Sequence, residues 1–178
     1  MNSYAKAFQN AMNYIDQLPN SLVIGQSVLY PGTSMSGTLS GVRKSKIIEF
    51  PVEEDLQLGV SIGLAISGFI PLSIFPRWNF LVLATNQLVN HLDKLKDFYE
   101  FENPPKVIIR TGIGSISPMH PGPQHVGDFT DAFKMLCPNI NFVKLDNPSV
   151  VLSEYQRAFE REDGKSTVLV EFGDLYNE

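Results

Sequence analysis

The sequence predicts an α/β fold: a three-layer sandwich in which helices cover both faces of a mainly parallel six-stranded sheet. Short apolar runs, each the length of one buried strand, alternate with helical patterns along all 178 residues. The strand runs are almost continuously apolar, which is typical of strands buried on both faces. No internal repeat, low-complexity tract or linker interrupts the pattern, so residues 1–178 are expected to form a single domain.

The first half of the sequence predicts three helices and three strands. The helical patterns cover residues 4–17, 55–67 and 79–99, and the strand patterns cover 21–25, 46–50 and 70–75. Pro19 ends the first helix, and Gly25 ends the first strand. A stretch rich in Gly, Ser and Thr, residues 31–41, predicts a loop with a short helix.

The second half predicts three more strands and two more helices. The strands are expected at residues 106–110, 141–145 and 167–172, and the helices at 127–136 and 149–161. The most unusual piece is the loop TGIGSISPMHPGPQH, residues 111–125, which has three prolines and three glycines.

One stretch has the length of a membrane span, because residues 56–75 carry no charge. Gly68 and Pro71 divide it, so a buried helix followed by a strand is the better interpretation, and we expect no association with a membrane. The N-terminal residues are polar and helical in pattern, without the apolar run of a signal peptide.

The composition excludes several classes of protein. Hydrophobic residues make up 43% and charged residues 19%, as in an ordinary globular protein. The net charge is −5 and no basic stripe occurs, so we expect no nucleic-acid partner. Cys137 is the only cysteine, which excludes a disulfide framework and a Cys-rich metal site. We expect a cytoplasmic protein and predict no metal site in this chain.

The predicted layout places a ligand site beyond the carboxyl ends of the strands. Acidic, aromatic and histidine-bearing turns fall there, so we expect them to gather at one edge. Two glycine motifs do not make a nucleotide site. Gly112 and Gly114 are placed like the start of a dinucleotide fingerprint, but prolines follow them where its helix would have to begin. Thr38 stands where a phosphate loop after Gly32 needs Lys.

Each candidate at this edge has a structural and a functional interpretation. The acids at 53–55 either complement the dipole of the following helix or include a proton donor or acceptor, and the spacing does not indicate which acid. Trp78 and Phe80 are either core aromatics or a platform for a flat ring. His120 and His125 are either solvated loop residues or functional ones. Gly59 and Gly63 share a helix face, which packs either against the core or against a second subunit.

The segment KIIEFPVEEDLQLGVSIGLAISGFIPLSIFPRWNFLVLATNQLVN resembles the middle of the pyrimidine-binding domain of transketolase-like thiamine diphosphate enzymes. It is most similar to the beta subunits of the two-chain 2-oxo acid dehydrogenases, of the pyruvate dehydrogenase type. The similarity extends from about Leu22 to Tyr176. Its strongest parts are the acid followed by a glycine-bearing helix, the aromatic-Asn-Phe turn, and the pair Gln124-His125.

The resemblance implies a role for each matching residue. Glu54 corresponds to the glutamate that hydrogen-bonds the aminopyrimidine ring of thiamine diphosphate and promotes its imino tautomer. Phe80 corresponds to the aromatic that packs against the pyrimidine, with Trp78 beside it. His125 corresponds to the histidine that faces substrate. Gln26 departs from the family, because those beta subunits usually carry an acid there.

The resemblance also implies a partner. In the family, a second domain with a Gly-Asp-Gly motif binds the diphosphate and Mg²⁺, and no such motif occurs here. A C-terminal domain typical of the beta subunits is missing as well. We therefore expect a separate diphosphate-binding subunit, in a homo- or hetero-oligomer.

Two functional hypotheses follow. In the first, the chain is the pyrimidine-binding subunit of a two-chain enzyme that cleaves a 2-oxo acid or ketose, a small-molecule substrate, and transfers the acyl or ketol fragment. In the second, it is a non-catalytic interaction protein that retains the fold. The substitution at Gln26 favours the second hypothesis, whereas Glu54, Phe80 and His125 favour the first.

Overall fold

The structure, a computed structural model, describes residues 2–30, 32–98 and 101–177. Pro31 and Tyr99, the first residue of a predicted loop and the last of a predicted helix, lie outside the described residues.

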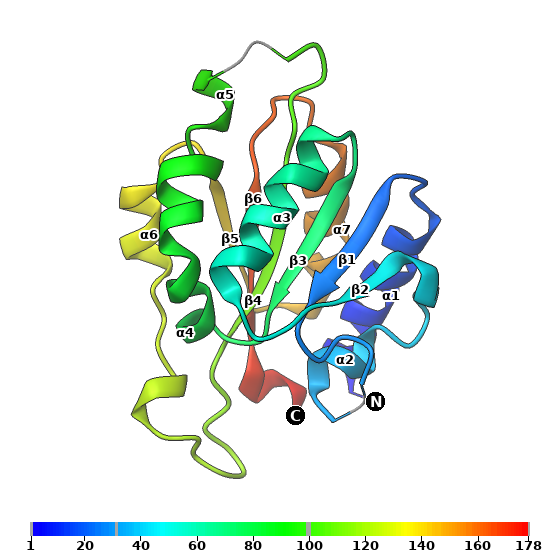
Figure 1. Cartoon of the computed structure of the whole chain (residues 1–178). Helices are drawn as coiled ribbons and strands as arrows, with labels where there is room; N and C mark the ends of the chain where they lie inside the picture. The colour runs from blue at the N-terminus through cyan, green and yellow to red at the C-terminus, as the bar shows by residue number, and fades with distance from the viewer. Residues whose placement is uncertain (1, 31, 99–100, 178) are drawn as a thin grey trace.

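Six strands form one sheet in which every neighbouring pair is parallel. The strands are β1 (Ser21–Gly25), β2 (Ile47–Glu49), β3 (Ile70–Phe75), β4 (Ile108–Ile113), β5 (Asn141–Leu145) and β6 (Thr167–Phe172), in the order β2-β1-β3-β4-β6-β5. Helices lie on both sides of the sheet (Figure 1), so the predicted fold class is confirmed.

The helices on one side are α1 (Ser3–Gln17), the short α2 (Ser34–Thr38) and α7 (Pro148–Glu160). Those on the other side are α3 (Glu54–Ile66), α4 (Trp78–Leu81), α5 (Leu95–Phe98) and α6 (Thr130–Leu136). Short 3-10 turns occur at Lys44–Lys46, Val82–Ala84, Pro123–His125 and Gly173–Tyr176, and a π-helical turn at Gln87–Leu92.

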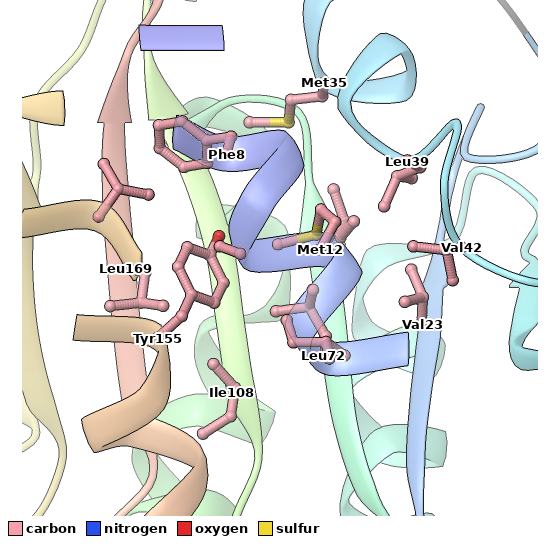
Figure 2. Packing of buried hydrophobic residues seen from close by; sticks show 14 of the residues in the cluster. Phe8, Met12, Val23, Met35, Leu39, Val42, Leu72, Ile108, Tyr155 and Leu169 are labelled. Carbon is pink, nitrogen blue, oxygen red and sulfur yellow. The ribbon is translucent and has the colours of Figure 1, made fainter. Parts of the chain in front are cut away.

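A separate apolar core fills each side of the sheet. On the α1 side, Phe8 and Met12 from α1 and Tyr155 from α7 pack over strand residues that include Leu72 and Leu169 (Figure 2). Each of these side chains is almost fully buried. Burial of one such side chain stabilises the fold by about 1.5–3 kcal/mol.

The charge-free stretch at residues 56–75 is divided as predicted. It comprises most of α3 and all of β3, and Gly68 between them has a φ of +92°, which favours glycine. Within the described residues, no helix is long and apolar enough to cross a membrane.

Several elements differ from the prediction. The helix predicted at 79–99 is interrupted by the 3-10 turn and the π turn, which keep the apolar side chains inward as an α-helix would. Strand β4 extends to Ile113 because Thr111 and Gly112 pair with β6. Strand β2 is only Ile47–Glu49, and α6 begins at Thr130 rather than at 127.

A charged pair lies inside the core on the α1 side of the sheet. Arg110 of β4 is 0% exposed, and its guanidinium lies 2.9 Å from the Glu171 carboxylate of β6. It also donates to the Thr38 hydroxyl at 2.9 Å and to the Tyr176 hydroxyl at 3.0 Å, and it stacks over Phe8 at 4.8 Å. Burial would lower the pKa of Arg110, but the Glu171 carboxylate outweighs it and raises that pKa.

Replacing Arg110 with Met should therefore destabilise the fold, because it leaves the Glu171 carboxylate buried without a counter-charge. We expect the free energy of unfolding in urea at pH 7 to fall by about 3–5 kcal/mol. Lys134→Ala, which removes the exposed ion pair with Asp131, is the control and should cost less than about 1 kcal/mol. Equal effects of the two substitutions would contradict this account of the core.

Candidate functional site

Three connections bring the candidate residues to the carboxyl edge of the sheet, the lower edge in Figure 1. Residues 50–53 join β2 to α3, residues 76 and 77 join β3 to α4, and residues 114–129 join β4 to α6. The last connection projects furthest from the sheet (Figure 1). In a parallel sheet these connections all leave from the same edge, so residues far apart in sequence come together there.

Among the three neighbouring acids, Glu54 is the buried one. It is the first residue of α3 and is only 5% exposed, whereas Glu53 is exposed. Asp55 accepts a hydrogen bond from Gln87 Nε2 at 3.1 Å. Among the described residues, no group hydrogen-bonds or pairs with the Glu54 carboxylate. The Glu54 carboxylate therefore has free acceptor capacity for a ligand or a second chain.

The rings of Phe80 and His125 lie together. Their centroids are 5.6 Å apart in an edge-to-face arrangement, and both residues are half-buried. The Nδ1 atom of His125 is enclosed and has no hydrogen-bond partner in the described part of the chain. The structure therefore pairs two residues that lie on separate connections, after β3 and after β4.

Two polar contacts fix the backbone around this pair. Arg77 Nη1 donates to the His125 carbonyl oxygen at 2.8 Å, and the Gly127 N–H donates to Asn79 Oδ1 at 3.3 Å. Both bonds join the start of α4 to the connection that carries His125. The pairing of Phe80 with His125 thus rests on contacts of the main chain as well as on the rings.

Trp78 is a core residue in this structure. It is 0% exposed and packs against the rings of Phe129, Phe133 and Phe142, with centroid distances of 6.5, 5.2 and 6.3 Å. The indole has no exposed surface in this chain, and the contact with a cofactor ring that the resemblance implies for Trp78 stays a prediction. The indole supports the turn that presents Phe80.

The remaining candidates have local roles. His120 is exposed, and its Nδ1 accepts from the Gly122 N–H at 3.0 Å, so it shapes the loop. Gln26 follows β1 and is half-buried, with its side-chain nitrogen enclosed and unpartnered within the described residues. Gly59 lies against the Gln87 side chain, while a Cβ at Gly63 would meet nothing within 4 Å.

The candidate site is an open surface. Clefts of about 390 and 260 Å³ occur at the same edge, but neither is lined by Glu54, Phe80 or His125. Among the described residues, no hydrogen bond or ring contact joins Glu54 to the Phe80–His125 pair. In the same part of the chain, no group of three or more His, Cys, Asp or Glu side chains could hold a metal ion.

An apolar face lies on the exposed side of α3, the helix that begins with Glu54. On α3 it consists of Leu56, Gly59, Gly63 and Ile66, and beside α3 it includes Val82 and Leu83 of the neighbouring 3-10 turn. From residue 56 to residue 92 the only charged side chain is Arg77, which lies at the edge of the sheet. We call these six residues the uncharged face; exposed apolar surface of this kind marks a contact with another molecule.

Comparisons with known proteins find similarity at the level of structure and not of sequence. No family model matches the chain, and no curated protein matches it. Among solved structures, a split-gene transketolase described as an inactive β4 tetramer superposes with a TM-score of 0.70 at 16% sequence identity. The match covers 94% of this chain and 50% of that one, so this chain spans half the length of the transketolase chain. The likeness shows the fold: this chain has the parallel α/β architecture of a transketolase pyrimidine-binding domain.

Proposed function

We propose that residues 1–178 form the pyrimidine-binding half of a two-chain thiamine diphosphate enzyme. The single observation that carries the proposal is Glu54, a residue only 5% exposed at the start of α3, whose carboxylate has no hydrogen-bond or ion-pair partner among the described residues. The fold shared with the split-gene transketolase supports the same conclusion. In the family that the sequence resembles, a glutamate at the corresponding position hydrogen-bonds the aminopyrimidine ring.

The residues present fit the pyrimidine end of the cofactor. The unpartnered carboxylate of Glu54 would accept a hydrogen bond from the ring and would hold a proton close to it. Phe80 offers a half-buried ring surface for packing against the pyrimidine. When bound, thiamine diphosphate supplies a carbon nucleophile that attacks the carbonyl next to the bond to be broken.

His125 would serve the substrate side of the site. Its Nδ1 is enclosed and unpartnered in the described structure, and its ring is held against Phe80. An imidazole nitrogen can accept a proton from a reacting group, and the imidazolium so formed can return it, which is the proton transfer that cleavage next to a carbonyl requires. The proposed substrates are a 2-oxo acid or a ketose, as in the 2-oxo acid dehydrogenase beta subunits that the sequence resembles.

A second chain would complete the site. Diphosphate and Mg²⁺ would be held by a partner with a Gly-Asp-Gly motif, since this sequence contains no such run. We place the docking of that partner on the uncharged face, because its residues Leu56, Ile66 and Leu83 are exposed and it lies on α3, the helix that begins with Glu54.

A non-catalytic interaction protein that retains the fold is the second candidate function. It is favoured by Gln26, which stands where the similar beta subunits carry an acid. The two functions differ in one requirement: only the enzyme needs a bound cofactor and a partner chain that supplies the diphosphate site.

Glu54→Gln should abolish turnover in the complex of this chain with its partner, because an amide cannot take up or release the proton. We expect kcat to fall by at least about 10²- to 10⁴-fold, with circular dichroism unchanged. Glu53→Gln is the matched control, since Glu53 is the exposed neighbour, and it should keep normal turnover. Wild-type-like activity of Glu54→Gln would refute the catalytic assignment.

Phe80→Leu should weaken cofactor binding by the complex, because it removes the ring that packs on the pyrimidine. Isothermal titration calorimetry should show a loss of about 0.5–1.5 kcal/mol, or about two- to twelvefold in Kd. Phe69→Leu is the control, because Phe69 is 40% exposed and precedes β3 at the opposite edge of the sheet. If both variants bind alike, Phe80 does not contact the cofactor.

Leu56→Asp should prevent capture of the partner, because it places a charge on apolar surface that would be buried against that partner. We expect affinity purification of the tagged chain from its native cells to recover a Gly-Asp-Gly-bearing chain with the wild type and to lose it with the variant. Leu136→Asp on α6 is the control, since Leu136 is 49% exposed and Leu56 is 53% exposed. Equal recovery from both variants would move the interface elsewhere.

A further inference from the structure

The segment at Gly173–Asn177 holds the connection that carries His125. This segment comprises the last 3-10 turn and Asn177, and it follows β6 directly. We call it the C-terminal turn. It contacts the start of the 114–129 connection through both backbone and side chains.

The backbones of the two segments pack without room for a side chain. A Cβ on Gly173 would lie 2.8 Å from the Gly114 carbonyl carbon and 2.9 Å from the Ser115 nitrogen. A Cβ on Gly114 would lie 3.1 Å from Val126 Cα and 3.3 Å from the His125 carbonyl oxygen. Gly114 is therefore sandwiched between the C-terminal turn and the backbone of His125.

Asp174 adds a set of hydrogen bonds to this packing. Its Oδ1 accepts from the backbone N–H groups of Ile116 at 2.9 Å and Ser117 at 3.1 Å, and from the Ser115 hydroxyl at 3.1 Å. Burial would raise the pKa of the Asp174 carboxyl, but the N–H donors of Ser117 and Ile116 outweigh it and lower that pKa. The carboxylate is thus charged at neutral pH, and charged acceptors make the stronger bonds.

Asn177 completes the contact from the surface. Its amide nitrogen donates to the Ser117 carbonyl oxygen at 2.7 Å and to the Ser115 hydroxyl at 3.2 Å. The C-terminal turn is itself anchored in the core on the α1 side of the sheet, since the Tyr176 hydroxyl donates to Glu171 at 3.0 Å and accepts from Arg110 at 3.0 Å. The Tyr176 ring also packs against Tyr4, with ring centroids 5.0 Å apart.

We infer that the C-terminal turn positions His125: Asp174 fixes residues 115–117, and the stacked backbones of Gly173 and Gly114 transmit that position to the His125 main chain. Asp174 and Asn177 are therefore positioning residues, and neither touches the Phe80–His125 rings. The importance of this position for catalysis rests on the proposed function, but the positioning itself is a property of the isolated chain.

Nuclear magnetic resonance of the isolated chain tests the inference without any cofactor. The Phe80 ring lies edge-to-face with His125 and displaces the ring-proton resonances of that histidine. Phe80→Leu defines the signal after loss of this displacement, and His91 and His120 are internal references. Asp174→Ala should shift the His125 resonances in the same direction as Phe80→Leu, whereas Asp174→Asn, which keeps an acceptor oxygen, should stay closer to the wild type.

Asp163→Ala is the matched control. Asp163 also accepts from a backbone N–H, that of Lys165 at 3.1 Å, and it pairs with Arg161, but it lies in a turn before β6 at the opposite edge. It should leave the His125 resonances unchanged. If Asp174→Ala does not fold, the exposed Asn177→Ala takes its place and should give a smaller shift in the same direction.

Unchanged His125 resonances in every folded variant of Asp174 and Asn177 would overturn the inference, as would an equal shift in Asp163→Ala. This result is independent of the proposed function, because Glu54→Gln could leave turnover intact while His125 still depends on the C-terminal turn. Conversely, a shift in Asp174→Ala supports the positioning role whether or not the chain binds thiamine diphosphate.

Discussion

The buried guanidinium of Arg110 is the interaction on which the carboxyl edge of the sheet depends. It joins β4 to β6 through Glu171, β4 to α2 through Thr38, and β4 to the C-terminal turn through Tyr176. Each partner comes from a different part of the chain. Removing the Arg110 charge would leave the Glu171 carboxylate without a counter-charge inside the core. It would therefore weaken all three attachments.

The connections that carry His125 and Phe80 are supported from opposite sides of the sheet. The C-terminal turn fixes the beginning of the 114–129 connection, and Arg77 fixes its middle by donating to the His125 carbonyl. On the other side of the sheet, Trp78 and three Phe rings support the turn that presents Phe80. Packing contacts from both cores therefore fix the positions of Phe80 and His125.

The candidate site is an open surface within this chain. Glu54, Phe80 and His125 line neither cleft at this edge, and the uncharged face lies on the exposed side of α3, the helix that Glu54 begins. An unpartnered carboxylate and an exposed apolar face can both be covered by a second protein surface. This is why the proposed function assigns half of an active site to the chain.

Much of the fold follows from pattern alone. Runs such as residues 70–75 and 167–172 are buried on both faces. Their continuous apolar character therefore predicts a parallel sheet covered by helices. Gly68 and Pro71 divided the charge-free stretch correctly. The π turn at Gln87–Leu92 could not be predicted, because the same apolar spacing serves an α-helix.

The site was predictable in part. A strand end followed by a short turn placed Glu54, Phe80 and His125 at one edge, but only the structure distinguishes buried Glu54 from exposed Glu53. Nothing in the spacing revealed that Trp78 is covered by Phe rings from α6 and β5. Arg110 also escaped prediction, since a charged residue at a strand end is usually solvated rather than buried.

The central claim is that this chain supplies the pyrimidine half of a shared thiamine diphosphate site. The most direct measurement is isothermal titration calorimetry of thiamine diphosphate with Mg²⁺ into the chain alone and into its complex with the Gly-Asp-Gly-bearing partner. The account predicts no measurable binding by the chain alone and stoichiometric binding by the complex. Binding of equal strength by the chain alone, or no binding by the complex, would contradict it.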